Sequence, residues 1–372
     1  MTARRAATSS IGSAGAPARY RVGIIGCGGI SNSHLRGYRE MPAVEVVAGA
    51  DVSEAVRQDR QSRTDELGIP MMYASTADML EREQLDIVSI CTWPIIRPEM
   101  TELACRAGVR AILAEKPMAV DLAGCDRMLA AAAHSGTLLV VGHQRRFRDR
   151  YVKAKELIDS GAIGQVLEIT GYGSADLLSS ATHTVDLIRF LLNDDEAEWV
   201  IGQIDTRRQE RRNAPTGYQQ WEETGMRYGH HVETGAFAMI QFRSGARATV
   251  ASGILQRKGK GGWPMTVYGS KGFLEVGPDR PEEVQDALRA RVKGKSEWIY
   301  PEARLNAGFK EEAEAIIAVL ERGGEHPLSA RAARHVHELL MAIFESSRQR
   351  ARIDLPLAFD GHPLEAMAVG EL

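Results

Sequence analysis

Cysteine is scarce, aromatic residues are few and long apolar runs are missing from this sequence of 372 residues. The four cysteines form no Cys-x-x-Cys pair and have no histidine at a zinc-site spacing, so neither a disulfide framework nor a metal site is indicated. No segment approaches the roughly 18 uninterrupted apolar residues of a membrane helix. The formal net charge of -3 leaves no basic footprint for nucleic acid. We therefore expect a cytoplasmic globular protein that acts on small molecules, without a membrane, nucleic-acid or metal partner.

The length of the chain predicts two domains, because single hydrophobic cores stop growing at roughly 250 to 300 residues. Residues 1–19 are rich in Ala, Ser, Gly and Arg, and we expect them to form a disordered tail. The pattern of the rest changes after Gly142. We place one domain at residues 20–142 and a second at residues 143–372.

In the first domain, short β-branched runs alternate with helical stretches, which is typical of βαβ units on a parallel sheet. We expect a doubly wound α/β sheet of the Rossmann type. The predicted strands are 21–25, 44–48, 87–91, 110–114 and 138–141. The predicted helices are 31–40, 53–66, 76–82, 99–107 and 121–134, the last with Asp121 as its N-cap.

The second domain has the mixed pattern of an α+β fold. Gly-containing turns at 243–245 and 270–272 join runs that alternate apolar and polar residues, so they predict antiparallel hairpins. The predicted strands are 165–172, 233–242, 246–254 and the two arms of 267–276. The predicted helices are 149–160, 182–192, 307–322 and 329–348.

A glycine-rich turn at residues 26–31 follows the first predicted strand and opens a helix, which is the context of a dinucleotide-binding fingerprint. Gly26 permits the tight turn, and Gly28 has no Cβ to block a pyrophosphate at the helix N-terminus. The residues expected at the cofactor's pyrophosphate are Gly26, Gly28, Gly29 and Ile30. The alternative is a doubly wound domain whose glycine-rich turn binds no dinucleotide.

Asp51 ends the second predicted strand, 25 residues after Gly26, where a carboxylate can bind the adenosine ribose. Because a carboxylate would repel a 2′-phosphate, Asp51 favours NAD as the cofactor. NADP stays possible, since Arg57 can approach from the following helix.

Two residues have the chemistry that hydride transfer requires. Lys116 follows the strand 110–114, at the carboxyl edge where ligands bind in open α/β sheets, and Pro117 keeps it in an extended connection. His183 begins a helix, shares a face with Asp186 and has a suitable pKa for proton transfer near neutral pH. A solvated surface lysine and a structural histidine are the alternatives.

Together these motifs resemble the Gfo/Idh/MocA family, named after glucose-fructose oxidoreductase, inositol dehydrogenase and a rhizopine catabolism protein. The resemblance runs from about Tyr20 to about Pro356 and includes GIIGCGGIS (23–31), AEKPMAV (114–120), THTVDLIRFL (182–191) and YGSKGFLEV (268–276). It implies a second domain with a large open, mainly antiparallel sheet that joins subunits into a homodimer or homotetramer. It also implies NAD(P)-dependent oxidation or reduction of a sugar, inositol or related polyol.

The resemblance also implies roles for individual residues. Lys116 would orient the reacting hydroxyl and His183 would be the acid/base. Thr92, Pro94 and Glu115 would lie at the cofactor. Gln144 and Arg145 would line the nicotinamide and substrate pocket.

The sequence departs from the family at Ser179, where many relatives have an aspartate one helical turn before the catalytic histidine. Serine cannot hold the negative charge that raises the basicity of a neighbouring group. Asp176 can supply a carboxylate if the helix begins that early, and Asp186 is a further candidate substrate residue. Trp93 and Trp263 can stack on a sugar ring, although packing in the core is an equal alternative.

Three functions are consistent with these residues. The first is a sugar or cyclitol dehydrogenase that uses Lys116 and His183. The second keeps its NAD tightly bound and uses transient oxidation for elimination, epimerisation or glycoside cleavage. The third is a non-catalytic nucleotide-binding sensor or corepressor, against which the presence of both residues argues.

Overall fold

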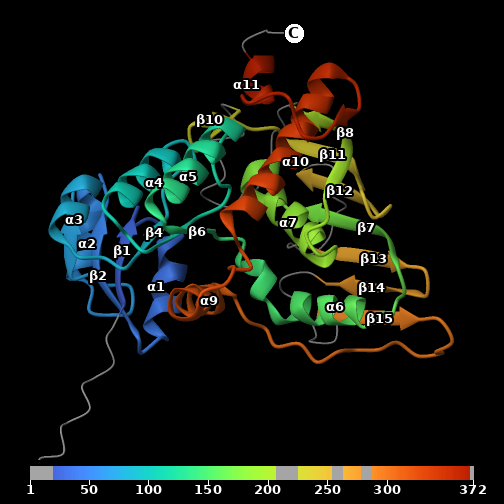
Figure 1. Ribbon diagram of the computed structural model, residues 1–372, viewed down its shortest axis with the longest axis horizontal. Helices are drawn as coiled ribbons and strands as arrows, with labels where there is room; N and C mark the ends of the chain where they lie inside the picture. The colour runs from blue at the N-terminus through green and yellow to red at the C-terminus, as the bar shows by residue number, and fades with distance from the viewer. Residues whose placement is uncertain (1–19, 207–224, 254–262, 278–286, 369–372) are drawn as a thin grey trace, which may run out of the picture.

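The computed structural model describes residues 20–206, 225–253, 263–277 and 287–368, so the expected tail at 1–19 lies outside it (Figure 1). The described chain forms two large sheets, one on each side of the molecule, with helices packed around and between them, and one small two-stranded sheet. No helix within this part of the chain is long and apolar enough to cross a membrane.

The first sheet has six parallel strands in the order β3-β2-β1-β4-β5-β6, which is the doubly wound order. Its central strands are short apolar runs that are buried on both faces, as parallel strands covered by helices must be. The strands are β1 (Tyr20–Ile25), β2 (Val44–Ala50), β3 (Met71–Tyr73), β4 (Ile87–Ile90), β5 (Ala111–Ala114) and β6 (Leu138–Val141). Five of these strands were predicted. The edge strand β3 was not, because three half-exposed residues leave no periodic signal.

The helices of this half lie where the sequence predicted them, with ends that differ by a few residues. They are α1 (Ser31–Arg39), α2 (Glu54–Ser62), α3 (Thr76–Arg82), α4 (Arg97–Arg106) and α5 (Leu122–Ser135). Asp121 is the N-cap of α5, as expected, and its carboxylate accepts a hydrogen bond from the N–H of Gly124 at 2.7 Å.

The second sheet has eight strands in the order β15-β14-β13-β7-β12-β11-β8-β16. All of its pairs are antiparallel except β12 with β7. The strands are β7 (Val166–Gly173), β8 (Ala197–Asp205), β11 (Gly235–Phe242), β12 (Arg247–Gly253), β13 (Met265–Gly269), β14 (Gly272–Val276), β15 (Leu288–Val292) and β16 (Ile353–Asp354). This sheet and the Rossmann-type sheet confirm the predicted fold class.

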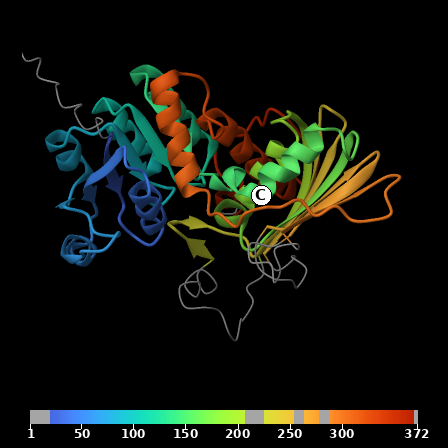
Figure 2. The same cartoon turned by 90° about the horizontal axis from the view of Figure 1, so that it is seen from below.

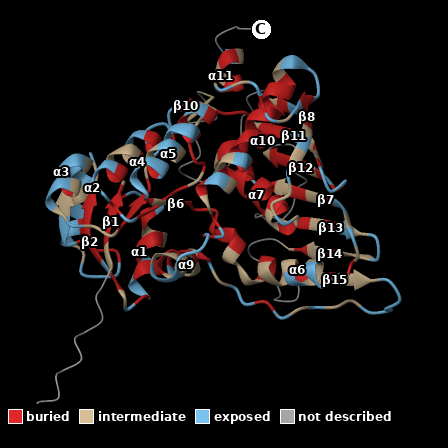
Figure 3. Ribbon diagram, viewed as in Figure 1, coloured by how far each residue is buried: buried red, intermediate tan, exposed pale blue. Residues whose placement is uncertain are grey.

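One face of the second sheet is covered by helices and the other is open (Figures 1 and 2). The covering helices are α6 (Asp149–Asp159), α7 (Thr182–Leu191) and α10 (Ala330–Gln349). They bury residues such as Ile240 and Val267, and Figure 3 shows this buried layer between helices and strands. The open face exposes Ile201, Phe237 and Tyr268.

The chain returns to the first sheet late in the sequence. Helix α9 (Phe309–Arg322) packs on α1 and adds Ile316 to the core that contains Val22 and Ile24. The last helix is α11 (Pro363–Ala368). Part of the segment that we assigned to the second domain therefore completes the core of the first.

Candidate active site

A cavity of about 480 Å³ opens between the two halves, a size that suits a small-molecule site. It lies at the carboxyl ends of β1, β4 and β5, where open α/β sheets bind ligands. On its other side are the 3-10 helix η1 (Gln144–Phe147), the π-helical turn η2 (Leu177–Ala181), α7 and the small hairpin of β9 (Met226–Arg227) with β10 (His230–His231). The predicted residues that line it are Gly28, Gly29, Ile30, Thr92, Trp93, Pro94, Glu115, Lys116, Gln144, Arg145, Ser179, His183 and Trp263.

The glycine turn has the geometry that a pyrophosphate requires. Gly26 has φ +82°, and a Cβ there would lie 3.0 Å from the backbone of Cys91 and Thr92, so only glycine fits. At Gly28 and Gly29 a Cβ would have no atom within 4 Å, because both residues face the open cavity. The turn therefore leaves room for a phosphate to approach its backbone, and the residues present fit a dinucleotide.

Asp51 lies beside this turn and supports it. One carboxylate oxygen accepts the N–H of Cys27 and the other accepts the N–H of Ser53, both at 2.8 Å. The guanidinium of Arg57 donates to the backbone oxygens of Asp51 and Val52, so the cation considered for NADP does lie near this strand end.

Glu115 is buried at the floor of the cavity. It contacts the Nε2 of His34 at 3.0 Å and accepts the backbone N–H of Lys116 at 3.1 Å. Burial would raise the pKa of Glu115, but His34, Lys116 and Arg97 together hold it below the usual value. Glu115 is therefore a buried carboxylate anion that binds the backbone N–H of Lys116.

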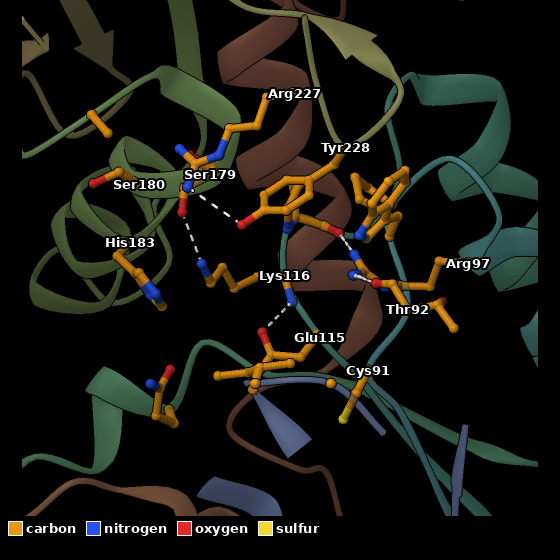
Figure 4. Close-up of a pocket in the computed structure, with 18 of the residues that line it drawn as sticks. Cys91, Thr92, Arg97, Glu115, Lys116, Ser179, Ser180, His183, Arg227 and Tyr228 are labelled. Carbon is orange, nitrogen blue, oxygen red and sulfur yellow. Dashed lines mark hydrogen bonds between the residues drawn. The ribbon is translucent and has the colours of Figure 1, made fainter. Parts of the chain in front are cut away.

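The ammonium group of Lys116 points across the cavity toward η2 and donates to the carbonyl oxygen of Ser179 at 2.8 Å (Figure 4). Burial lowers the pKa of Lys116; Glu115 opposes this shift and Arg145 adds to it. The side chain is thus held by one hydrogen bond that spans the two halves of the molecule.

His183 lies next to Lys116 in the same cavity (Figure 4). Its ring makes edge contacts with Trp263 at 5.4 Å and His143 at 5.7 Å between centroids. Its Nδ1 is buried without a hydrogen-bond partner in the described part of the chain. Burial and the charges of Arg145 and Lys116 lower the pKa of His183 well below its usual value, so the ring is neutral at pH 7.

Asp176 and Ser179 form a small network at the cavity wall, in which Ser179 lines the cavity and Asp176 lies behind it. Asp176 is the N-cap of η2 and accepts the N–H of Ser179 at 2.8 Å. The Ser179 hydroxyl donates to the same carboxylate. Arg227 from β9 donates to Asp176 at 2.8 Å and to the Ser179 hydroxyl at 2.7 Å. A buried carboxylate is thus present near Lys116, three residues before the position that Ser179 occupies.

Asp186 does not line the cavity, although it is three residues from His183. Helix α7 is buried on nearly all sides, so its polar residues face different neighbours. Asp186 forms a buried ion pair with Arg146 at 2.8 Å, on the side away from the cavity.

Comparison with known proteins agrees with this geometry. Residues 20–143 match the model of an oxidoreductase family with an NAD-binding Rossmann fold, and residues 151–275 match the GFO/IDH/MocA C-terminal domain. The chain belongs to the Gfo/Idh/MocA family. Like the family, it is an oxidoreductase with an NAD-binding Rossmann domain, as predicted.

Named members of the Gfo/Idh/MocA family include several sugar and inositol dehydrogenases. D-apiose dehydrogenase of Paraburkholderia graminis is 27% identical over 354 residues, which cover 91% of this chain and 90% of that protein. Inositol 2-dehydrogenase 3 of Saccharopolyspora erythraea is 32% identical, over 47% of this chain and 54% of its own length. A solved structure of levoglucosan dehydrogenase in complex with NADH superposes with a TM-score of 0.76 at 20% identity, over 91% of this chain and 100% of that chain, so the two share the fold.

Among the residues that line this Gfo/Idh/MocA cavity and that the sequence did not reveal are Arg227, Tyr228 and Arg97. Arg227 and Tyr228 come from a polar segment without periodicity, and the Tyr228 ring lies 5.9 Å from that of Trp93 at the cavity mouth. Arg97 is buried and donates to the backbone oxygens of Thr92 and Pro117, so it joins two loops of the site. No sequence signal could have found these residues, because their partners are distant or are backbone atoms.

Proposed function

We propose that the chain is an NAD-dependent dehydrogenase that transfers hydride between the nicotinamide cofactor and a secondary hydroxyl or ketone of a sugar, inositol or related polyol. The observation that carries the proposal is the meeting of Lys116 and a neutral His183 in one cavity with the open glycine turn. When bound, the dinucleotide supplies the hydride acceptor.

Lys116 has the position of a group that orients the substrate oxygen. Its ammonium already donates to the Ser179 carbonyl, which fixes the direction of the side chain and leaves two N–H bonds for a ligand. A hydrogen bond from the ammonium stabilises the negative charge that builds on the oxygen as the C–H bond breaks.

His183 has the properties of the base. A neutral imidazole accepts the hydroxyl proton as the carbonyl forms. The imidazolium that results lies in a buried site near Lys116 and Arg145, and the same charges that lower its pKa favour release of the proton. In the reverse direction the imidazolium returns this proton to the oxygen.

The surroundings of this pair suit a ring with many hydroxyl groups. Aromatic side chains at the cavity are Trp93, which is 58% exposed, Tyr228 and Trp263. They offer apolar faces for the C–H groups of a sugar, and the amide of Gln144 offers hydrogen bonds. The Ser179 hydroxyl donates its hydrogen to Asp176, so toward a ligand it can act only as an acceptor. Relatives named for D-apiose and inositol support this substrate class.

The test is a panel of sugars, inositols and sugar acids incubated with NAD⁺, with reduced nicotinamide followed by absorbance. We expect at least one substrate, and a fall in kcat of about 10²- to 10⁴-fold in Lys116→Met and His183→Asn. Lys153→Met and His134→Asn are matched controls, because both lie on helix surfaces away from the cavity and should keep full activity. Full turnover in either site variant would contradict the mechanism.

Mass spectrometry of the native protein separates the alternatives. Nucleotide that stays bound, together with product formation and no net NADH, would favour transient oxidation. Nucleotide binding without turnover of any compound would favour a sensor.

A further inference from the structure

Arg60 is a buried cation directly behind the nucleotide turn. It belongs to the last turn of α2 and is only 5% exposed. Its Nε and Nη2 donate to the carbonyl oxygen of Cys27 at 3.1 and 2.9 Å, and Nη2 also reaches the carbonyl of Gly28 at 3.3 Å. Further bonds go to the side chains of Ser31 at 3.1 Å and Asn32 at 2.5 Å. One guanidinium thus contacts most of the turn.

These bonds determine which way the peptide groups of the turn point. In a trans peptide, the C=O of one residue and the N–H of the next point in opposite directions. Because Arg60 holds the carbonyls of Cys27 and Gly28, the N–H groups of Gly28 and Gly29 point away from it. The cavity lies on that side, lined by the same two glycines. The guanidinium therefore aims two N–H groups at the place where a phosphate would bind.

The charge of Arg60 has no carboxylate partner in the part of the chain that the structure describes. Its acceptors are carbonyl, hydroxyl and amide oxygens, including that of Leu67 at 3.2 Å. The nearby carboxylate of Asp51 accepts from the N–H groups of Cys27 and Ser53 instead. Burial of a charge without a counter-charge is energetically costly. An anion bound on the cavity side of the turn, opposite Arg60, would supply that counter-charge.

We propose that Arg60 is a positioning residue for the dinucleotide pyrophosphate. It orients the N–H groups of Gly28 and Gly29, and the pyrophosphate balances its charge through the turn. This role concerns nucleotide binding by the Rossmann domain and does not depend on which substrate is oxidised.

The experiment compares NADH binding, measured by nucleotide fluorescence, in wild type, Arg60→Gln and Arg60→Lys. Hydrogen bonds with a charged group are strong enough that Arg60→Gln should raise the Kd on the order of 10-fold or more. The salt dependence of the Kd should also weaken, because one charge is gone. Arg60→Lys keeps the charge and should recover the salt dependence and part of the affinity. With an identified substrate, KM for NAD⁺ should rise while kcat at saturating NAD⁺ stays within about twofold, because Arg60 does not line the cavity.

Arg39→Gln is the matched control, because Arg39 also donates to a backbone carbonyl of this half, that of Gly68 at 2.9 Å, but does not contact the turn. It should bind NADH like wild type. A wild-type Kd and salt dependence in Arg60→Gln would overturn the proposal, and so would equal affinities in Arg60→Gln and Arg60→Lys. If Arg60→Gln does not fold, Arg60→Lys decides: a raised Kd with unchanged kcat supports the role, and a wild-type Kd refutes it.

Discussion

Replacing Arg146 with methionine is expected to destabilise the protein strongly. Arg146 lies in η1 and is 3% exposed in its side chain, as is its partner Asp186 on α7. The guanidinium contacts Asp186 at 2.8 Å and Asp194 at 2.7 Å. It therefore ties the segment that carries Arg145 to the helix that carries His183.

The expected loss of unfolding free energy differs between a substitution of Arg146 and a substitution of Asp186. Arg146→Met leaves the Asp186 carboxylate buried, with His143 at 3.8 Å as the remaining ion-pair partner among the residues that the structure describes, and breaking a buried pair in this way costs about 3–5 kcal/mol. Asp186→Asn keeps Arg146 bound to Asp194, which is 40% exposed and remains hydrated. We therefore expect a smaller loss, about 1–3 kcal/mol, from the second change.

Denaturant unfolding followed by circular dichroism measures both free energies. The double variant Arg146→Met with Asp186→Leu removes both buried charges and should be more stable than Arg146→Met alone, because apolar replacement of a buried pair is often close to neutral. Arg243→Met, which breaks a largely exposed pair with Glu196, is the control and should cost less than about 1 kcal/mol. An Arg146→Met variant as stable as the control would refute this reasoning.

Three further predictions concern the pH profile, the turn and the open sheet. Because the pKa of His183 is lowered, kcat/KM for oxidation should stay high below pH 6.5 and fall only at a lower pH, where His183 becomes protonated. In Lys116→Met a neighbouring positive charge is removed, so the pKa of His183 should rise and the fall in kcat/KM should occur at a higher pH. Gly26→Ala places a side chain at φ +82°, so it should cost at least about 1–2 kcal/mol of stability and weaken NADH binding in a fluorescence titration. Light scattering should find a homodimer or homotetramer, and Phe237→Glu on the open sheet face should dissociate it; a monomeric wild type would contradict this assignment.

Much of the first half could be predicted because its signals are local. A buried strand, a glycine with positive φ and an N-cap such as Asp121 each depend on a few neighbouring residues. The strand β3 escaped prediction because it is short and half-exposed. The π-helical turn η2 also escaped, because its spacing of hydrogen bonds leaves no mark in the apolar pattern.

The site was harder to predict where it depends on contacts between distant segments. Helical spacing placed His183 and Asp186 on one face, but α7 is buried all round, and each residue meets a different neighbour. The pairing of Asp176 with Arg227 joins residues 51 positions apart. The Asp176 carboxylate contacts Ser179 locally, but sequence spacing could not show that Arg227 binds both residues.

From the sequence alone, the turn at residues 26–31 and Asp51 could be predicted as a dinucleotide site, because the glycine spacing and the strand-end carboxylate are local signals. It also identified Lys116 and His183 as candidates. The folded structure was needed to show that these two residues lie in one cavity, that Arg60 supports the turn from behind and that Asp186 is a structural partner of Arg146. These contacts join residues that are about 30 to 60 positions apart in the chain, so they exist only once the chain has folded, and no local pattern records them.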